Sequence, residues 1–276
     1  MRLGIVGAGA LGLLFAEALA PVARVNLFGR GDDPAGLRDA DMVLVAVKTY
    51  DTLAALEPLR DVLAPGATIV SLQNGLLQVE QIEAALGADR TILLAPTTEG
   101  ATRDGAGTLR RGGIGSTMVG IPAGRPGTNR VDALAKLLRA AGLSAAVADP
   151  IEPHLWAKLV VNAAINPVTA LARRPNAYVV DDPVAAARAA ALAREAADVA
   201  IATGIVLPYA DPQARVRDVA RATGANRSSM LQDIERGRPT EIEAINGEVV
   251  RRGRLLGVPT PENERMLYEV RRAAGA

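Results

Sequence analysis

Three polar residues in the apolar stretch "HLWAKLVVNAAINPVTAL", residues 154–171, have the types and the spacing of a chemical site. Lys158, Asn162 and Asn166 follow one another at four-residue steps, and each step places the next residue roughly 40° round a helix and about 6 Å further along. An ammonium group can donate a proton, and a neutral amide offers hydrogen-bond donors and an acceptor. The three polar groups therefore line one edge of an otherwise apolar helix, where such groups could do chemistry; a solvated helix edge is the simpler alternative.

Lysine is rare in this chain. Of its 31 basic residues only Lys48, Lys136 and Lys158 are lysines. Arginine stays protonated in proteins, whereas burial can lower the pKa of a lysine enough for proton exchange. This bias favours a chemical role for a lysine in an apolar helix, while Lys136 in "VDALAKLLRAAG" has the setting of an ordinary surface charge.

A glycine-rich segment, "GIVGAGALG", follows the first predicted strand and begins a helix. Gly7, Gly9 and Gly12 have the spacing G-x-G-x-x-G, which in this context permits a tight turn, a close approach to a pyrophosphate and tight helix–strand packing. The free N–H groups and the dipole at the helix start favour an anion. We therefore expect a dinucleotide-binding loop made of Gly7, Ala8, Gly9, Ala10, Leu11 and Gly12.

The end of the second predicted strand indicates which dinucleotide is bound. An NAD-binding chain usually carries an acid there, about 20 residues beyond the loop, that binds the ribose 2′-hydroxyl. This sequence reads "NLFGR" instead, and the guanidinium of Arg30 suits a 2′-phosphate. NADP is therefore predicted. Asp32 and Asp33 follow, and we expect these carboxylates to cap the next short helix.

Two further polar residues follow predicted strands, Lys48 in "VAVKTY" and Asn74 in "SLQNGL". Ligands of doubly wound sheets bind at the carboxyl ends of strands, so both are candidate ligand contacts. The Asn-Gly pair is also a turn signal. Tyr50 and Trp156 are interpreted as packing residues.

A second group of polar residues lies in "NRSSMLQDIERGRPTEIEAINGEVVRRG". Asn226, Ser228 and Ser229 precede a helical run, where an N-cap role is a serious alternative to ligand binding. Glu241 follows Pro239-Thr240, so its carboxylate could simply stabilise the dipole at a helix N-terminus. Periodicity alone leaves both alternatives open.

The elements that must position these residues change character near the middle of the chain. Apolar runs such as "RLGIV" and "ADMVLVAVK" alternate with helical runs such as "ALGLLFAEALA", which predicts a doubly wound, mostly parallel α/β domain over residues 1–150. Beyond that point amphipathic stretches such as "PVAAARAAALAREAADVAIATG" predict an all-α domain over residues 151–276.

Composition excludes several classes of function. With 31 basic and 30 acidic residues the net charge is +1, so no field attracts nucleic acid or an acidic membrane. The chain has no cysteine and a single histidine, His154, which excludes disulfides, a thiol nucleophile and a multi-histidine metal site. No secretory signal or uncharged membrane-spanning run is recognised, so a soluble, cytoplasmic protein is expected.

The motifs together resemble the ketopantoate reductase (2-dehydropantoate 2-reductase) family through nearly the whole chain. The resemblance is carried by "GAGALG", "VLVAVKTY", "QNGL", "TTEGA", "LWAKLVVNAAINPVTAL", "GVPTPEN" and the long block from Asn226 to Gly253. It implies a Rossmann domain joined to a helical domain, with the active site in the cleft between them. It also implies NADPH-dependent reduction of ketopantoate to pantoate in pantothenate and coenzyme A synthesis.

The resemblance also implies roles for particular residues. Lys158 matches the family's general acid, and Glu241 a residue near the nicotinamide ribose and the substrate. Arg30, Lys48 and Ala101 fall on the cofactor side, and Asn74 matches a residue that contacts both ligands. The implied substrate contacts are Asn74, Asn162, Asn166, Asn176, Asn226 and Ser229.

One segment departs from the family's pattern. Only residues 31–40, "GDDPAGLRDA", separate the second strand from the next one, so we expect some β-structure to be absent on the adenosine side.

Two alternatives to the main interpretation are a reductase of another small branched 2-keto acid and a non-enzymatic NADP-binding protein. A homodimer through the helical domain is also expected.

Overall fold

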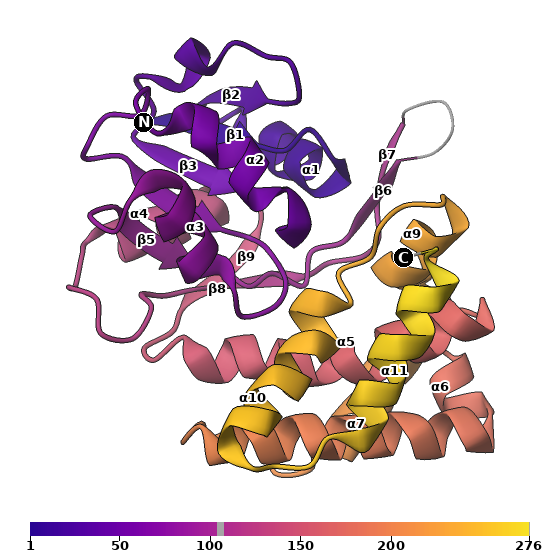
Figure 1. Ribbon diagram of the computed structural model, residues 1–276. Coiled ribbons are helices and arrows are strands. Elements are labelled where there is room, and N and C mark those ends of the chain that lie inside the picture. Colours follow the sequence, from indigo (N-terminus) through magenta and orange to yellow (C-terminus); the bar gives the residue numbers. More distant parts are fainter. Residues whose placement is uncertain (104–107, 276) are drawn as a thin grey trace. The chain divides into compact units, whose positions relative to one another are not determined.

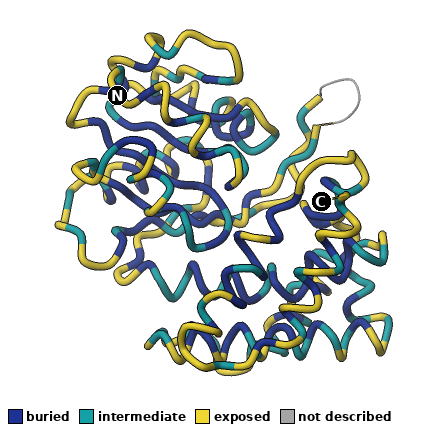
Figure 2. The backbone as a smooth tube through the Cα atoms, in the orientation of Figure 1, coloured by how far each residue is buried: buried dark blue, intermediate teal, exposed yellow. Residues whose placement is uncertain are grey.

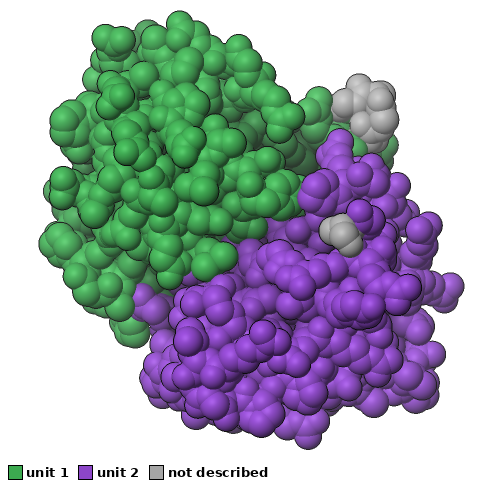
Figure 3. All heavy atoms as spheres, in the orientation of Figure 1, with its two compact units in different colours: residues 1–73, 77–151 green, residues 74–76, 152–276 purple. Residues whose placement is uncertain are grey.

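The structure, a computed structural model that describes residues 1–103 and 108–275, divides into two units at the end of the strand-rich half. Unit 1 contains residues 1–73 and 77–151, and unit 2 contains residues 74–76 and 152–276 (Figure 3). Three residues that follow a strand of the first half thus belong with the helical unit, which the sequence pattern does not indicate.

Unit 1 is built on a five-stranded sheet with the order β2-β1-β3-β4-β5 (Figure 1). Its strands are β1 (Arg2–Val6), β2 (Arg24–Phe28), β3 (Met42–Val45), β4 (Thr68–Ser71) and β5 (Thr91–Leu94). All four pairings are parallel, with Ile5 beside Leu27 on one side and Leu44 on the other. This arrangement confirms the predicted Rossmann-type fold.

Helices pack on both faces of this sheet, which is why its central strands are apolar without alternation. The helices of unit 1 are α1 (Ala10–Leu19), α2 (Thr52–Leu56), α3 (Gln78–Leu86) and α4 (Arg130–Ala140). Leu3 and Ile5 of β1 pack into one buried cluster with Phe15 of α1, whereas Val6 packs into another with Ile82 of α3. Figure 2 shows strands β1, β3, β4 and β5 as largely buried and many of the surrounding loops as exposed.

Strand β2 forms an edge of the sheet, since among the described strands only β1 pairs with it. The chain between β2 and β3 contains the short 3-10 helix η1 (Pro34–Leu37) in place of further β-structure. The side-chain amide of Asn26 on β2 donates to the carbonyl of Gly36 at 2.5 Å, which holds η1 beside the edge strand. The structure thus agrees with the expectation from the short segment 31–40.

The remaining strands of unit 1 form two small pairs. β6 (Ala101–Arg103) is antiparallel to β7 (Leu109–Arg111), and β8 (Ser116–Val119) is parallel to β9 (Ser144–Val147). Isolated β-bridges join Thr117 of β8 to Thr97, and Gly120, the residue after β8, to Leu94 at the end of β5. These bridges connect the second pair of strands to the main sheet. The run "TILLAPTTEGA", residues 91–101, contains β5 and reaches the first residue of β6, because the chain leaves the main sheet between these two strands.

Unit 2 is helical. Its elements are α5 (Glu152–Ala172), α6 (Tyr178–Asp181), α7 (Pro183–Ala202), α8 (Pro212–Ala222), α9 (Ser229–Glu235), the π-helix η4 (Glu243–Gly247), α10 (Glu248–Leu256) and α11 (Pro261–Ala273). The two longest, α5 and α7, share a buried core to which α7 contributes alanines at four-residue spacing, Ala185, Ala189 and Ala193. Small side chains along one face allow the two backbones to approach closely.

Helix α5 contains a proline, and another segment compensates for it. Pro167 has no N–H, so the carbonyl of Ala163 loses its intrahelical donor. The side-chain amide of Asn246 in η4 donates to that carbonyl at 3.0 Å and also to Oδ1 of Asn263 at 2.9 Å. An unsatisfied buried carbonyl costs about 1–3 kcal/mol, so this bond fixes η4 to α5.

Candidate active site

The glycine loop has the geometry that its spacing predicts. Gly7 has a φ of +117°, and a Cβ added to Gly12 would lie 1.8 Å from the carbonyl oxygen of Gly7. Gly9 is the N-cap residue of α1, and no side chain caps the helix there. A Cβ added to Gly9 would have no neighbouring atom within 4 Å. The loop therefore presents free backbone N–H groups at a helix start, which fits a dinucleotide pyrophosphate.

Arg30 and the two following aspartates lie in different settings at the end of β2. The side chain of Arg30 is 95% exposed, and its guanidinium lies 4.0 Å from Oδ1 of Asp51. Asp33 caps η1 by accepting from the N–H of Ala35 at 2.9 Å. Asp32 instead accepts from the N–H of Gly29 at 2.8 Å, so the expectation that it caps the next helix is wrong.

Lys48 and Ala101 also lie in unit 1. Lys48 follows β3, is half-buried, and precedes the short helix η2 (Thr49–Asp51); Ala101 begins β6 and is half-buried. Gln73, which no sequence motif indicated, has a buried amide that donates to the carbonyl of Val47 at 3.0 Å and to Oγ1 of Thr52 at 2.7 Å. This glutamine holds the segment after β3, which contains Lys48, to the end of β4.

The lysine of the polar stripe lies in an unusual electrostatic environment. Lys158 is half-buried, and burial lowers its pKa to about 8, because removing water disfavours the charged ammonium. The negative charge of Glu241 acts in the opposite direction and raises the pKa of Lys158. The lysine is therefore mostly protonated at neutral pH and can release its proton more readily than an exposed lysine can.

Glu241 and Asn74 form the second part of this arrangement. Glu241 is buried, and its carboxylate accepts from Nδ2 of Asn74 at 2.9 Å. Gly75 has a φ of +85°, and a Cβ there would lie 2.5 Å from the carbonyl oxygen of Ala244. The Asn-Gly pair is thus a turn, and the same turn brings the amide of Asn74 to the carboxylate.

The other residues of the stripe are progressively more buried. Asn162 is half-buried like Lys158, and Asn166 is 7% exposed. Trp156 is buried and packs in the core of unit 2 as expected, with the guanidinium of Arg252 5.9 Å from its ring centroid. Tyr50, interpreted as a packing residue, is 45% exposed, so that interpretation is wrong.

The two serines before α9 divide their roles. Ser228 is the N-cap and accepts from the N–H of Leu231 at 3.1 Å, and its hydroxyl lies 2.8 Å from that of Thr169 on α5. Ser229 is the first residue of α9 and is exposed. The cap alternative therefore applies to Ser228, and the Ser228–Thr169 contact attaches the segment that contains Ser229 to α5.

Asn176 and Asn226 lie beside each other. The N–H of Asn176 donates to the carbonyl of Asn226 at 2.9 Å, and its side-chain Nδ2 donates to Oγ1 of Thr223 at 2.9 Å. Oδ1 of Asn176 is buried and has no hydrogen-bond partner among the described residues, whereas the residue Asn226 is exposed. Asn176 is therefore partly occupied in holding the turn that contains Asn226.

The described residues contain no candidate metal site and one helix of membrane-spanning length. Among residues 1–103 and 108–275, no group of three or more His, Asp or Glu side chains could hold a metal ion. Helix α5 is long and apolar enough by composition to cross a membrane, but most of it is buried inside the protein. Its apolar character is explained by packing in the core of unit 2.

A glycine loop at a parallel sheet is typical of dinucleotide-binding proteins, and a half-buried lysine beside a buried carboxylate suits proton transfer, so the two features indicate a dinucleotide-dependent oxidoreductase. Comparison with known proteins identifies the family. The family described as "Ketopantoate reductase PanE/ApbA" matches residues 30–124, and the family described as "Ketopantoate reductase PanE/ApbA C terminal" matches residues 150–274. The chain belongs to the ketopantoate reductase family.

Individual relatives agree with this assignment. The 2-dehydropantoate 2-reductase of Archaeoglobus fulgidus is 37% identical over 293 residues, which cover 98% of this chain and 97% of that protein. Among solved structures, the 2-dehydropantoate 2-reductase of Geobacter metallireducens has a TM-score of 0.91 at 28% identity, over 99% of this chain and 100% of that one. The ketopantoate reductase of Ralstonia eutropha JMP134 has a TM-score of 0.90 at 29% identity, over 100% and 99%.

Proposed function

We propose that this protein reduces 2-dehydropantoate (ketopantoate) to pantoate with NADPH, a reaction of pantothenate and coenzyme A synthesis. The observation that carries the proposal is Lys158, half-buried beside Glu241 on a stripe of amides in a family of ketopantoate reductases. Binding of a dinucleotide alone would require none of these residues, which argues against a non-enzymatic role.

The reaction needs one proton donor. When bound, the reduced nicotinamide supplies a hydride to the C2 carbonyl carbon of the substrate, and the electrons of the C=O double bond move onto its oxygen. The ammonium of Lys158 stabilises that negative charge and transfers one proton from Nζ to the oxygen, which gives the alcohol. Glu241 keeps Lys158 protonated by raising its pKa, and Asn74 holds the carboxylate of Glu241 in place.

The remaining polar residues of unit 2 bind the substrate. Neutral amides can hydrogen-bond to both a hydroxyl and a carboxylate, because each amide offers donors and an acceptor. Asn162 and Asn166 act from the stripe of α5, and Ser229 acts from the start of α9. Asn176 and Asn226, which lie beside each other, complete the set. Unit 2 is thus the substrate domain.

Unit 1 is the dinucleotide domain in this proposal. Residues 7–12 hold the pyrophosphate, and Lys48 and Ala101 line the cofactor side. Arg30 binds the 2′-phosphate and selects NADPH, because its exposed guanidinium can make a charge-assisted contact there.

Replacing Arg30 by alanine should weaken NADPH binding by about 1.5–3 kcal/mol, the scale of a charge-assisted hydrogen bond, and should barely change NADH binding. Titration of each reduced cofactor into both proteins, followed by fluorescence, measures the effect. Equal losses for NADPH and NADH would show that Arg30 does not contact the 2′-phosphate.

Replacing Ser229 by alanine should raise KM for the keto acid more than it lowers kcat, because its substrate contact is present in the ground and the transition state alike. Its neighbour provides a matched control. Ser228→Ala removes the cap of α9 and should lower the free energy of unfolding by about 1 kcal/mol. Steady-state kinetics and thermal melts of both variants separate binding from capping. An unchanged KM in Ser229→Ala would remove Ser229 from the site.

A substrate panel tests the proposal as a whole. NADPH oxidation is measured with ketopantoate and with other small branched 2-keto acids, and kcat/KM should be highest for ketopantoate. A higher value for a different 2-keto acid would assign the protein to that substrate. Absence of oxidation with all of them would overturn the enzymatic proposal.

A further inference from the structure

A tight turn at the end of β2 fixes the carboxylate of Asp32. The N–H of Gly29 donates to Oδ2 of Asp32 at 2.8 Å, and the N–H of Asp32 donates to the carbonyl of Gly29 at 3.3 Å. Gly31, the third residue of this four-residue turn, has a φ of +92°, which a type II turn requires at that position. Two hydrogen bonds and a glycine thus hold Asp32 in one place.

The fixed carboxylate lies near the glycine loop. A Cβ added to Gly29 would lie 3.7 Å from Oδ2 of Asp32 and 3.2 Å from Cβ of Ala8. Asp32, Gly29 and Ala8 therefore share one corner, between the end of the second strand and the loop that fits a pyrophosphate. In folds of this kind, the adenosine ribose of a dinucleotide is bound at that corner.

We propose that Asp32 is a second determinant of cofactor selection, which opposes Arg30, and that the protein consequently uses NADH as well as NADPH. The inference rests on the proposed dinucleotide-dependent function. A carboxylate accepts a hydrogen bond from a ribose 2′-hydroxyl and repels a 2′-phosphate. The guanidinium of Arg30 has the opposite preference, but it is almost fully exposed and lies 4.0 Å from a second carboxylate, that of Asp51.

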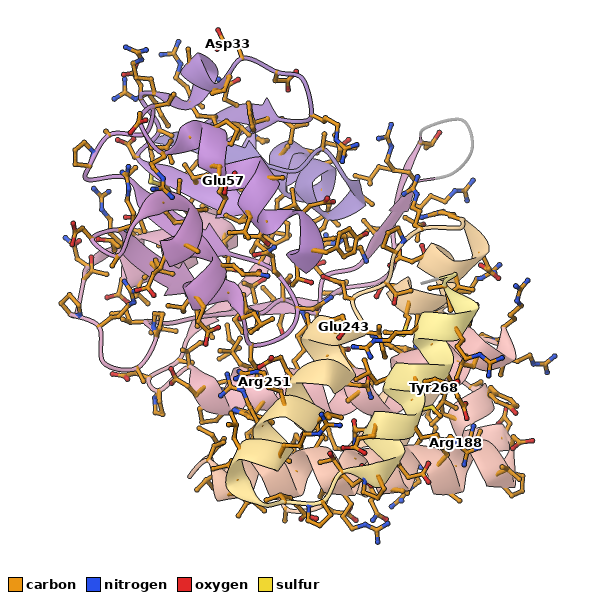
Figure 4. All side chains as sticks on the ribbon, in the orientation of Figure 1. Asp33, Glu57, Arg188, Glu243, Arg251 and Tyr268 are labelled. Atoms are coloured by element: carbon orange, nitrogen blue, oxygen red, sulfur yellow. The ribbon has the colours of Figure 1, made fainter. Side chains whose placement is uncertain are left out.

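The short segment between β2 and β3 makes this arrangement possible. Asp33 supplies the cap of η1, so Asp32 is not needed there. Asp33 lies at the outer side of unit 1 in Figure 4. The two neighbouring carboxylates thus have different surroundings, which gives the test of Asp32 a matched control.

The experiment compares wild type with Asp32→Asn and Asp33→Asn. An asparagine at position 32 can still accept from the N–H of Gly29, so the substitution removes the charge and retains the turn. Dissociation constants for NADPH and NADH are measured by fluorescence titration without substrate. Displacement by adenosine 2′,5′-bisphosphate and by AMP isolates the contribution of the 2′-phosphate.

In Asp32→Asn, the ratio of the NADPH to the NADH dissociation constant should fall by about fivefold to tenfold, the size expected for one exposed charge near a phosphate. Adenosine 2′,5′-bisphosphate should bind more tightly by a similar factor, and AMP should change little. In Asp33→Asn the ratio should stay at the wild-type value.

Two results would overturn the inference. One is an unchanged ratio in Asp32→Asn, and the other is an equal shift in Asp33→Asn, which would indicate a general effect of net charge. Failure of the proposed function gives a different result: both cofactors bind, but no 2-keto acid is reduced, and the binding ratio still decides the role of Asp32.

Discussion

Replacing Lys158 by alanine should lower kcat by roughly 10²–10⁴-fold, the usual range for a positioned general acid that also supplies a charge. The alkoxide that forms on hydride transfer would then have to take its proton from water, without an ammonium to stabilise it. Affinity for NADPH should stay nearly unchanged, because Lys158 belongs to unit 2 whereas the glycine loop belongs to unit 1. Steady-state kinetics and cofactor titration measure the two quantities.

Lys136 provides the control for this substitution. It is an exposed lysine on α4, and Lys136→Ala should leave kcat and the melting temperature close to their wild-type values. A Lys158→Ala variant that turns over within a few-fold of wild type would exclude Lys158 as the proton donor.

The activity should depend on pH through the same lysine. Its ammonium form donates the proton and its pKa is about 8, so kcat/KM should be constant below that pH and fall above it. For a single ionisation the decrease is tenfold per pH unit, which gives about a hundredfold loss at pH 10. The protonated form is the active one, so the activity is lost as pH rises and not as it falls.

Glu241 sets the position of that alkaline limb. Its negative charge raises the pKa of Lys158, so Glu241→Gln should move the limb to lower pH. Glu243→Gln is the matched control, because Glu243 pairs with Arg271 of α11, and Figure 4 shows it beside that helix. The pH profiles of both variants and of wild type measure the effect. A limb that stays in place in Glu241→Gln would contradict the proposed coupling.

Local sequence patterns predicted the elements of this protein well. The glycine spacing required a strand before it and a helix after it, and β1 and α1 lie there. The four-residue spacing of Lys158, Asn162 and Asn166 required a helix, and all three lie on α5. Such features depend on neighbouring residues alone, so a single sequence contains them.

Contacts between distant segments could not be predicted in this way. The bond between Asn74 and Glu241 spans 167 residues, and no periodicity indicates it. Asp32 and Asp33 are the same residue type at adjacent positions, and only the turn at Gly31 decides which of them caps η1. Ser228 and Ser229 differ likewise, because the hydroxyl of Thr169 lies beside the first serine.

The proline in α5 has a consequence for how this chain can vary. Because Pro167 leaves the carbonyl of Ala163 without its helical donor, the amide at position 246 is needed as long as the proline is kept. A relative with another residue at 167 regains that N–H, which removes this one requirement on position 246. The two positions should therefore covary among homologues, with a side-chain donor at 246 wherever proline occupies 167.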